Sequence, residues 1–305
     1  MHLRLLDLDD TVTAQPGLRD ASAWSSVSTV PLRDLAARLR LWSRNATMQQ
    51  ARERLRRDKP AGAALTMLGS GDFHHLAVPL IEQADEKLTV VHFDNHPDWV
   101  RWAPRWHCGS WVNQVLRLPQ VARVVTIGPC SEDLDRPDWK GGNLAALAAG
   151  RIVLFPWQHA PSKVRRRIAD GPGHHWENGY LAWQNLADSD RGTNADRILA
   201  AVETDAVWIT IDKDVLAEAD ALTNWDQGLM PLQAMRELIT AIGARTRILG
   251  ADICGEFSAP RLSNPLKAIE SRIDRPQRAA DAARLARNAE VNRQLLRTIA
   301  EAAAC

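Results

Sequence analysis

The sequence lacks the features that define several large classes of protein. Its 305 residues include only four cysteines, which are widely spaced and form neither a CxxC pair nor a disulfide framework. No apolar run reaches the ~18 residues that a membrane-spanning helix requires. Acidic residues among the first ten positions interrupt the apolar stretch that a signal peptide would need. We therefore expect a protein of the reducing cytoplasm with no membrane partner.

A strong excess of charge is also missing. Lys and Arg number 38 against 37 Asp and Glu, which gives a net charge of +1. This balance disfavours a nucleic-acid partner, which would select a basic surface. The hydrophobic fraction of 45% is ordinary for a globular protein, and no internal repeat or long low-complexity linker divides the chain. We expect one domain over residues 1–305.

The aromatic residues are unevenly distributed. One Tyr and 4 Phe accompany 12 Trp, and the indoles of Trp99, Trp102, Trp106 and Trp111 lie in one short stretch. Large indole side chains normally pack in a core or line a ligand site. We expect most of this cluster to pack a loop or a subunit contact.

Short apolar segments alternate with segments of helical periodicity along the chain. Such nearly continuous apolar strands, separated by helices, are typical of a parallel sheet covered on both faces. We expect strands at 3–6, 65–68, 88–93, 121–127, 152–155, 206–211 and 247–253. Helices are expected at 32–58, 75–83, 194–203 and 232–242, with a long C-terminal helix at 278–304.

Chemistry-bearing side chains follow three of these strands. They lie in the segments GSGDFHH (69–75), VHFDNHPD (91–98) and ITIDKD (209–214). In an open α/β sheet, ligands bind beyond the carboxyl ends of the strands. These three segments are therefore the expected site of function.

The spacing within the segments indicates a metal site. Side chains at i and i+2 of a strand share a face, so Asp94 and His96 point the same way, and so do Asp212 and Asp214. Carboxylates gathered near a core are costly unless a cation neutralises them. Mostly oxygen donors with one or two imidazoles suit Mn²⁺, and two such ions can deprotonate a bridging water.

The same segments resemble a known family. The segment at 94–98 is similar to the Asp-Ala-His-x-Asp motif of the arginase/agmatinase (ureohydrolase) family, and the segment at 210–214 is similar to its Ser-x-Asp-x-Asp motif. The segment at 71–74 resembles its Gly-Gly-Asp-His segment, with the Asp displaced by one. The resemblance extends from about residue 65 to 257. It implies a three-layer α/β/α fold with a central, mostly parallel sheet, and a binuclear manganese site that hydrolyses a C–N bond.

The resemblance also implies which residues hold the metal. Two Mn²⁺ ions would share the carboxylates of Asp94 and Asp212. His75 remains an alternative to His74, because this segment does not match the family's Gly-Gly-Asp-His segment exactly. The implied ligand set is His74, Asp94, His96, Asp98, Asp212 and Asp214.

Further residues carry implied catalytic and substrate roles. His107, in a segment similar to the family's His-Gly segment, would serve as proton shuttle, as an imidazole can at neutral pH. Glu256 resembles the family glutamate that receives the guanidinium group through two parallel hydrogen bonds. The expected substrate is a guanidino-containing small molecule, the expected assembly a homo-oligomer, and the candidate substrate contacts are Trp102, Arg105, Asn224 and Trp225.

Three alternatives remain at the level of sequence. The motif continuing from Asp214 lacks the family's Asp-Pro, which allows a binding protein that has kept the scaffold without turnover. The segment around Asp7 and Asp9 is similar to the Asp-x-Asp-x-Thr motif of haloacid dehalogenase-like phosphatases, with Asp7 as nucleophile. A deacetylase-type amide hydrolase shares the fold with one zinc, although the second carboxylate of the Asp212/Asp214 pair favours two ions.

Overall fold

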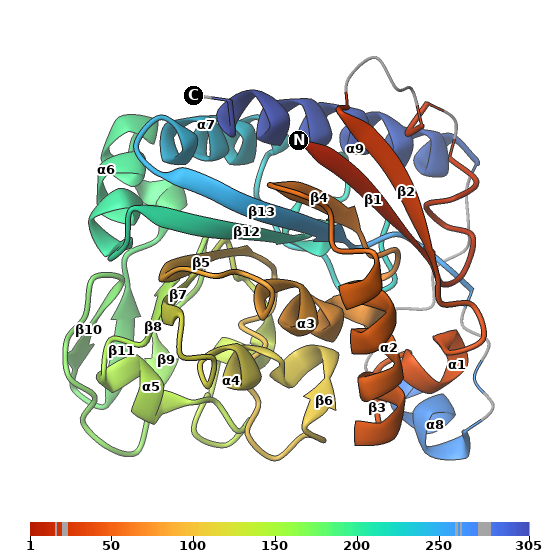
Figure 1. Cartoon of the computed structure of the whole chain (residues 1–305). Helices are drawn as coiled ribbons and strands as arrows, with labels where there is room; N and C mark the ends of the chain where they lie inside the picture. The colour runs from red at the N-terminus through yellow and green to blue at the C-terminus, as the bar shows by residue number, and fades with distance from the viewer. Residues whose placement is uncertain (16, 20–23, 260–261, 263, 274–281, 305) are drawn as a thin grey trace.

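The computed structural model describes residues 1–15, 17–19, 24–259, 262, 264–273 and 282–304. Its centre is an eight-stranded sheet in which neighbouring strands run parallel (Figure 1). Across the sheet the order is β2 (Ser26–Pro31), β1 (His2–Asp7), β4 (Ala64–Met67), β13 (Arg247–Cys254), β12 (Ala206–Asp212), β5 (Leu88–Phe93), β7 (Val121–Ile127) and β8 (Ile152–Phe155).

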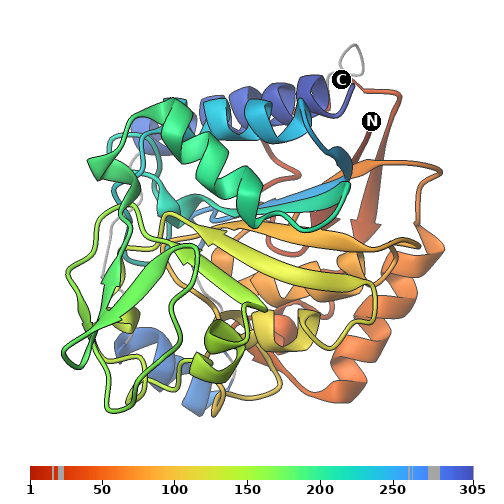
Figure 2. The same ribbon diagram turned by 90° about the vertical axis from the view of Figure 1, so that its left-hand side faces the viewer.

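Helices cover both faces of this sheet and make three layers (Figures 1 and 2). One layer holds α6 (Arg191–Ala201), α7 (Leu232–Gly243) and α9 (Ala282–Ala302). The opposite layer holds α1 (Ala36–Leu39), α2 (Asn45–Arg57), α3 (Ala77–Ile81), α4 (Val112–Val115), α5 (Leu144–Ala148) and α8 (Pro265–Ile273).

The strands are apolar on both faces because two cores lie against them. On β5, Leu88 and Val90 belong to one core, whereas Val91 and Phe93 belong to the other. This alternation follows from the two-residue period of a strand. It explains why the central strands are nearly continuous apolar segments, and it confirms the predicted α/β class with a mostly parallel sheet.

The helices in the structure differ from the predicted ones more than the strands do. The expected helix at 32–58 is divided into α1 and α2 by β3 (Trp42–Ser43), which pairs with β6 (Trp106–His107). Leu41 takes a left-handed conformation with φ 65°, which cannot continue a right-handed helix. The expected helix at 75–83 is a 3₁₀ segment, η2 (Gly71–Leu76), followed by α3. Residues 278–281 of the predicted C-terminal helix lie outside the described residues.

Two parts of the architecture were not predicted. β2 forms an edge of the large sheet, and a second, antiparallel sheet is made of β9 (Ser162–Lys163), β10 (His174–Glu177) and β11 (Tyr180–Trp183). The hairpin between β10 and β11 turns at Asn178 and Gly179, which both have positive φ angles of 49° and 88°. Asn-Gly favours this tight turn because both residues tolerate that conformation.

The order of the central strands positions the site. β4, β13, β12 and β5 are consecutive neighbours, and the carboxyl ends of parallel strands meet at one edge. The three chemistry-bearing segments follow β4, β5 and β12, so the fold gathers them at that edge. Among the described residues, no helix combines the length and the apolarity needed to cross a membrane.

Candidate metal centre

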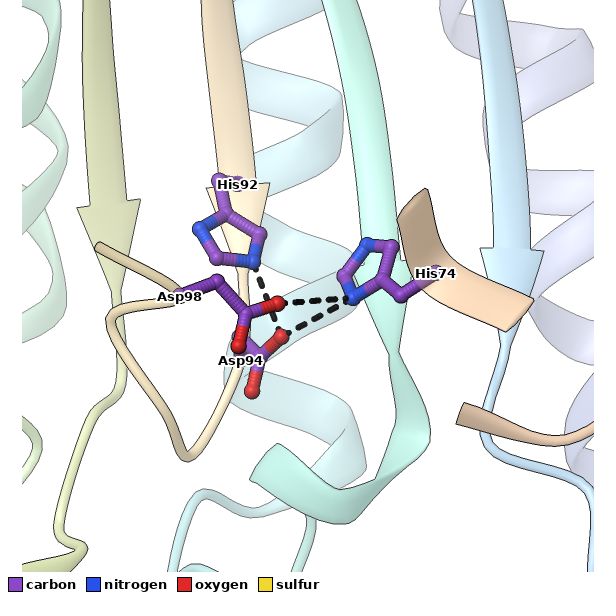
Figure 3. Close-up of side chains that lie close together, drawn as sticks. All are labelled: His74, His92, Asp94 and Asp98. Atoms are coloured by element: carbon purple, nitrogen blue, oxygen red, sulfur yellow. Dashed lines mark hydrogen bonds and ion pairs between the residues drawn. The ribbon is translucent and has the colours of Figure 1, made fainter. Parts of the chain in front are cut away.

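His74 faces three carboxylates at the edge of the sheet. Its Nδ1 lies 3.1 Å from Oδ2 of Asp94, 3.3 Å from Oδ2 of Asp98 and 3.8 Å from Oδ2 of Asp212. Figure 3 shows His74, from η2, pointing toward Asp94 and Asp98, which follow β5. Both ring nitrogens of His75 are buried and make no hydrogen bond within the described part of the chain. The geometry therefore places His74, and not His75, in the cluster.

A second group of side chains adjoins the first through Asp94. Nδ1 of His96 lies 3.0 Å from Oδ2 of Asp214 and 3.5 Å from Oδ1 of Asp94. The two oxygens of Asp94 thus face different imidazoles, since Oδ2 faces His74. All six predicted ligands converge, and the arrangement has the form of two adjacent cation positions that share a carboxylate.

Backbone groups fix the orientation of these carboxylates. The N–H of His96 donates to Oδ1 of Asp94 at 2.7 Å, and the N–H of Asp214 donates to Oδ1 of Asp212 at 3.1 Å. The N–H of Asn95 donates to Oδ1 of Asp214 at 3.1 Å. The other oxygen of each carboxylate faces an imidazole: Oδ2 of Asp94 and of Asp212 face His74, and Oδ2 of Asp214 faces His96.

A buried hydrogen-bond chain sets the tautomer of His74. The hydroxyl of Thr210 donates to Oδ1 of Asp252 at 2.7 Å and lies 2.9 Å from Nε2 of His74. The hydroxyl proton is used toward Asp252, so Nε2 of His74 carries a proton and donates to Thr210. A neutral His74 then presents the lone pair of Nδ1 to the cluster. A protein group that holds the second nitrogen in this way is the usual partner of a metal-binding histidine.

The buried charges indicate that a cation belongs here. Burial raises the pKa of Asp98 to about 6, and the charge of Asp94 adds to the rise. Burial, together with the charges of Asp212 and Asp94, raises the pKa of Asp214 well above its ordinary value. Nδ1 of His74 is buried and has no partner in hydrogen-bonding geometry. A divalent ion would neutralise the carboxylates and occupy that lone pair, so the residues present fit a metal centre.

Five of the six predicted ligands, all except His74, line a cavity of about 810 Å³. His107 also lines this cavity; its Nδ1 accepts the N–H of Gly109 at 2.8 Å, and its Nε2 lies 2.5 Å from Oε1 of Glu270. Because Nδ1 is an acceptor, Nε2 carries the proton and donates to Glu270. The predicted proton shuttle is therefore located on the wall of the cavity and paired with a carboxylate from α8.

Two of the four candidate substrate contacts lie at the cavity. Trp102 and Trp225 line it. Arg105 instead stacks over Trp106 and donates to Gln114, and Asn224 is buried against Ser258. Neither Arg105 nor Asn224 is among the described residues that line the cavity.

Glu256 is not placed as its resemblance implied. It is buried, forms an ion pair with Nζ of Lys213 and accepts from Nδ2 of Asn292 at 2.6 Å. It is absent from the described residues that line the cavity. The position before it, Gly255, has φ +88°, and a Cβ there would lie 2.5 Å from Oδ1 of Asp212. The glutamate thus stabilises a buried lysine behind the site.

The phosphatase alternative finds no support in the geometry. Asp7 is paired with Arg33 at 2.7 Å, and Asp9 is paired with Arg40 at 2.5 Å. The carboxylate that would act as nucleophile is therefore held by a guanidinium group. These two acids stabilise the loop after β1.

Sequence reasoning missed several residues that contact the cluster. Nε2 of His92 donates to Oδ2 of Asp94 at 2.9 Å, and the indole of Trp111 donates to Oδ2 of Asp98 at 2.6 Å. Asp226 lies 2.9 Å from Nε2 of His96. The His92 contact had a signal, because His92 lies on β5 and Asp94, two residues later, directly follows that strand.

Replacing Thr210 by Val should weaken metal binding while preserving the shape of the side chain. His74 would lose the acceptor that fixes its tautomer, and we expect the affinity for Mn²⁺ to fall by about 10–100-fold. Calorimetric titration of the metal-free protein measures this. Thr66→Val is the matched control, because Thr66 is equally buried but bonds Arg4. An unchanged Mn²⁺ affinity in Thr210→Val would contradict the role assigned to the hydrogen-bond chain.

Replacing Glu256 by Gln should lower the free energy of unfolding, and not only the affinity for substrate. The substitution leaves Lys213 buried without its counter-charge, and breaking such a pair costs about 3–5 kcal/mol. Urea denaturation measures the change, and Glu290→Gln on the exposed face of α9 is expected to leave the midpoint in place. Full stability with lost substrate binding would instead support the role that the resemblance implied for Glu256.

Comparisons with known proteins bear on the fold. No family model matches the sequence. An uncharacterized protein of Thermotoga maritima is 26% identical over 197 residues, and the match spans 65% of this chain and 60% of that protein's length.

Solved structures of ureohydrolases resemble the chain over nearly its whole length. Proclavaminate amidino hydrolase from Streptomyces clavuligerus gives a TM-score of 0.58 at 16% identity, covering 99% of this chain and 91% of that one. Formimidoylglutamase from Bacillus subtilis gives 0.60 at 12% identity, covering 98% and 86%. Arginase from Medicago truncatula gives 0.55 at 14% identity, covering 99% and 86%. The protein therefore has the arginase-like α/β fold that its motifs predicted.

Proposed function

We propose that this protein is a metal-dependent hydrolase that cleaves a C–N bond in a guanidino or related amidine or amide small molecule. The observation that carries the proposal is the placement of Asp94, whose two oxygens face His74 and His96 separately at the floor of a cavity. The fold adds support, because its structural neighbours include proteins described as an amidino hydrolase, an arginase and a formimidoylglutamase.

The proposed ligands divide into two sets around Asp94. His74, Asp98 and Asp212 would complete one position, and His96, Asp214 and Asp212 would complete the other. Carboxylate oxygens dominate both sets, which favours Mn²⁺ among the common divalent ions. When bound, two such ions supply positive charge and acidify a water molecule at the floor of the cavity.

His107 and Glu270 are proposed to move the proton that the reaction requires. Hydrolysis adds the oxygen of water to the substrate carbon, breaks the C–N bond and delivers a proton to the departing amine. The imidazole of His107 is held between the N–H of Gly109 and the carboxylate of Glu270, and it faces the cavity. Nδ1 of His107 already accepts an N–H and Nε2 carries a proton, so Glu270 is the member of the pair that can accept the proton of the attacking water and return it to the nitrogen that leaves.

The cavity walls favour a cationic substrate. Besides the proposed ligands, its lining carries the acids Glu132, Asp133, Asp226 and Glu270 against one cationic side chain, Lys140. Lys140 also lies 3.7 Å from Glu132, which reduces its influence. A guanidinium or amidinium group would be attracted by this excess of negative charge.

Two indoles give the walls a second means of holding a cation. Trp102 and Trp225 line the cavity, and Trp225 is anchored by a 3.1 Å bond from its Nε1 to Oδ1 of Asp72. An indole face attracts a planar cation with about 0.5–2 kcal/mol. The walls therefore support a planar, positively charged substrate better than a neutral one.

Mn²⁺-dependent release of urea or ammonia from a panel of guanidino, amidine and amide compounds tests the function. Asp94→Asn removes the shared carboxylate, and we expect activity to fall by about 10³-fold, in line with the several kcal/mol that metal ions contribute. Asp85→Asn, at an exposed acid paired with Lys59, should keep full activity. Bound metal without turnover on any compound would favour the alternative of an inactive binding protein.

Glu270→Gln should lower kcat by about 10-fold or more, because the proton-transfer pair contributes part of the ~10²–10⁴-fold typical of acid–base catalysis. The metal content should not change, since Glu270 is outside the proposed ligand sets, and the pH dependence of kcat should change because the proton-transfer pair has lost its carboxylate. Glu132→Gln is the control at another cavity carboxylate. A pH profile identical to that of the unmodified protein would remove Glu270 from the mechanism.

A further inference from the structure

Cys254 lies beside the proposed metal ligands because of the sheet register. β12 and β13 run parallel, and Asp212 is the direct partner of Cys254. Residues paired in this way on neighbouring strands project to the same face. Sγ of Cys254 is 3.2 Å from Oδ2 of Asp212, and the cysteine is wholly buried.

The carboxylate of Asp212 is confined next to this thiol. A Cβ at Gly71 would lie 2.4 Å from Oδ2 of Asp212, and a Cβ at Gly255 would lie 2.5 Å from Oδ1. Each oxygen of the Asp212 carboxylate therefore lies close to the backbone of a glycine. This close approach limits the room that the carboxylate has to move away from Cys254.

Nδ1 of His74, which makes no hydrogen bond to a described residue but lies 3.1 Å from Asp94 and 3.3 Å from Asp98, completes a triangle with these two groups. Ligand atoms of His74, Asp212 and Cys254 all lie within 4.8 Å of one another, and all three residues are buried. Nδ1 of His74, which makes no hydrogen bond in the described structure, faces this group. Zn–S and Zn–N bonds of about 2.3 and 2.0 Å separate two donors on one ion by up to about 4.3 Å. Two of the three separations lie within that limit, at 3.2 Å from Sγ of Cys254 to Oδ2 of Asp212 and 3.8 Å from Nδ1 of His74 to the same oxygen.

We propose that Cys254 is a sulfur ligand of the ion held by His74 and Asp212. The inference rests on the proposed function in so far as that function requires a metal there. On coordination, a metal–sulfur bond forms and the thiol proton passes to solvent, with no change of oxidation state. The neighbouring position, formed by Asp94, His96 and Asp214, has only oxygen and nitrogen donors.

The two cation positions then differ in their metal preference. A thiolate favours softer ions such as Zn²⁺ or Co²⁺, whereas a carboxylate-rich position suits Mn²⁺. The centre would therefore hold the softer ion at the His74 position and the harder ion at the His96 position. A sulfur donor also distinguishes this centre from the oxygen-rich set deduced from the sequence motifs.

Titration of the metal-free, full-length protein with Co²⁺ tests the assignment. A sulfur-to-cobalt charge-transfer band in the near ultraviolet should appear and saturate with one equivalent. Cys254→Ser should abolish the band while equilibrium dialysis still detects bound Co²⁺. Cys130→Ser and Cys108→Ser should keep it, and the latter matters because Cys108 lines the cavity. Bound Co²⁺ without the band, or a band that survives in Cys254→Ser, overturns the proposal.

Two further measurements separate the inference from the proposed function. Competition between Zn²⁺ and Mn²⁺ should show a preference for Zn²⁺ at one position that falls about 10–100-fold in Cys254→Ser. X-ray absorption of the Zn²⁺-loaded, unsubstituted protein needs no variant and should show a sulfur neighbour near 2.3 Å. Metal bound by oxygen and nitrogen alone would end the inference and leave the hydrolase proposal intact, whereas failure to bind any divalent metal would end both.

Discussion

The concentration of buried carboxylates at one edge of the sheet is the constraint on which the rest of the structure depends. Asp94, Asp98, Asp212 and Asp214 are at most 6% exposed, and like charges at that depth oppose folding unless a counter-charge neutralises them. In Asp94, Asp212 and Asp214, one carboxylate oxygen accepts a hydrogen bond from a backbone N–H. These bonds fix the orientation of the carboxylates without supplying a full positive charge. Buried acids that lie close together lower the stability of the fold. Such a cluster is expected where the acids bind a cation, and not where they only pack a core.

The sheet supplies the convergence that this constraint requires. β4, β13, β12 and β5 are neighbours although they are far apart in the chain, so segments from residues 71, 94, 212 and 254 meet at a single edge. Parallel strands do this because their carboxyl ends point the same way, and crossover helices on both faces keep the strands buried. The same burial excludes water from the carboxylates, which raises the pKa of Asp98 to about 6. The strand order therefore determines both where the carboxylates meet and how deeply they are buried, and the burial raises the pKa of Asp98.

Local spacing was sufficient to predict what lies within one segment, but not what lies between segments. The seven apolar strands follow from the period of a strand, and the structure contains them. Asp94 with His96, and Asp212 with Asp214, do meet at the site, but β5 ends at Phe93 and β12 at Asp212, so the turns after the strands bring them together. Cys254 could not be found in this way, because its contact with Asp212 depends on β13 being next to β12. Glu270 lies 163 positions from His107, and only the docking of α8 brings them together. The partner of Glu256 could not be found in this way either, because Lys213 is on the neighbouring strand end and lies 43 positions away in the chain.

The floor and the walls of the cavity obey different physical requirements. The floor needs donors at fixed positions, and it is built from strand ends and short 3₁₀ segments packed between the two cores. The walls come from loops and from α8, with Trp102 exposed by 67% and with acids at 132, 133 and 226. Loops tolerate substitution because few buried contacts depend on them. The side chains of these walls can therefore differ, and with them the molecule that fits the cavity, while the donors at the floor stay in place.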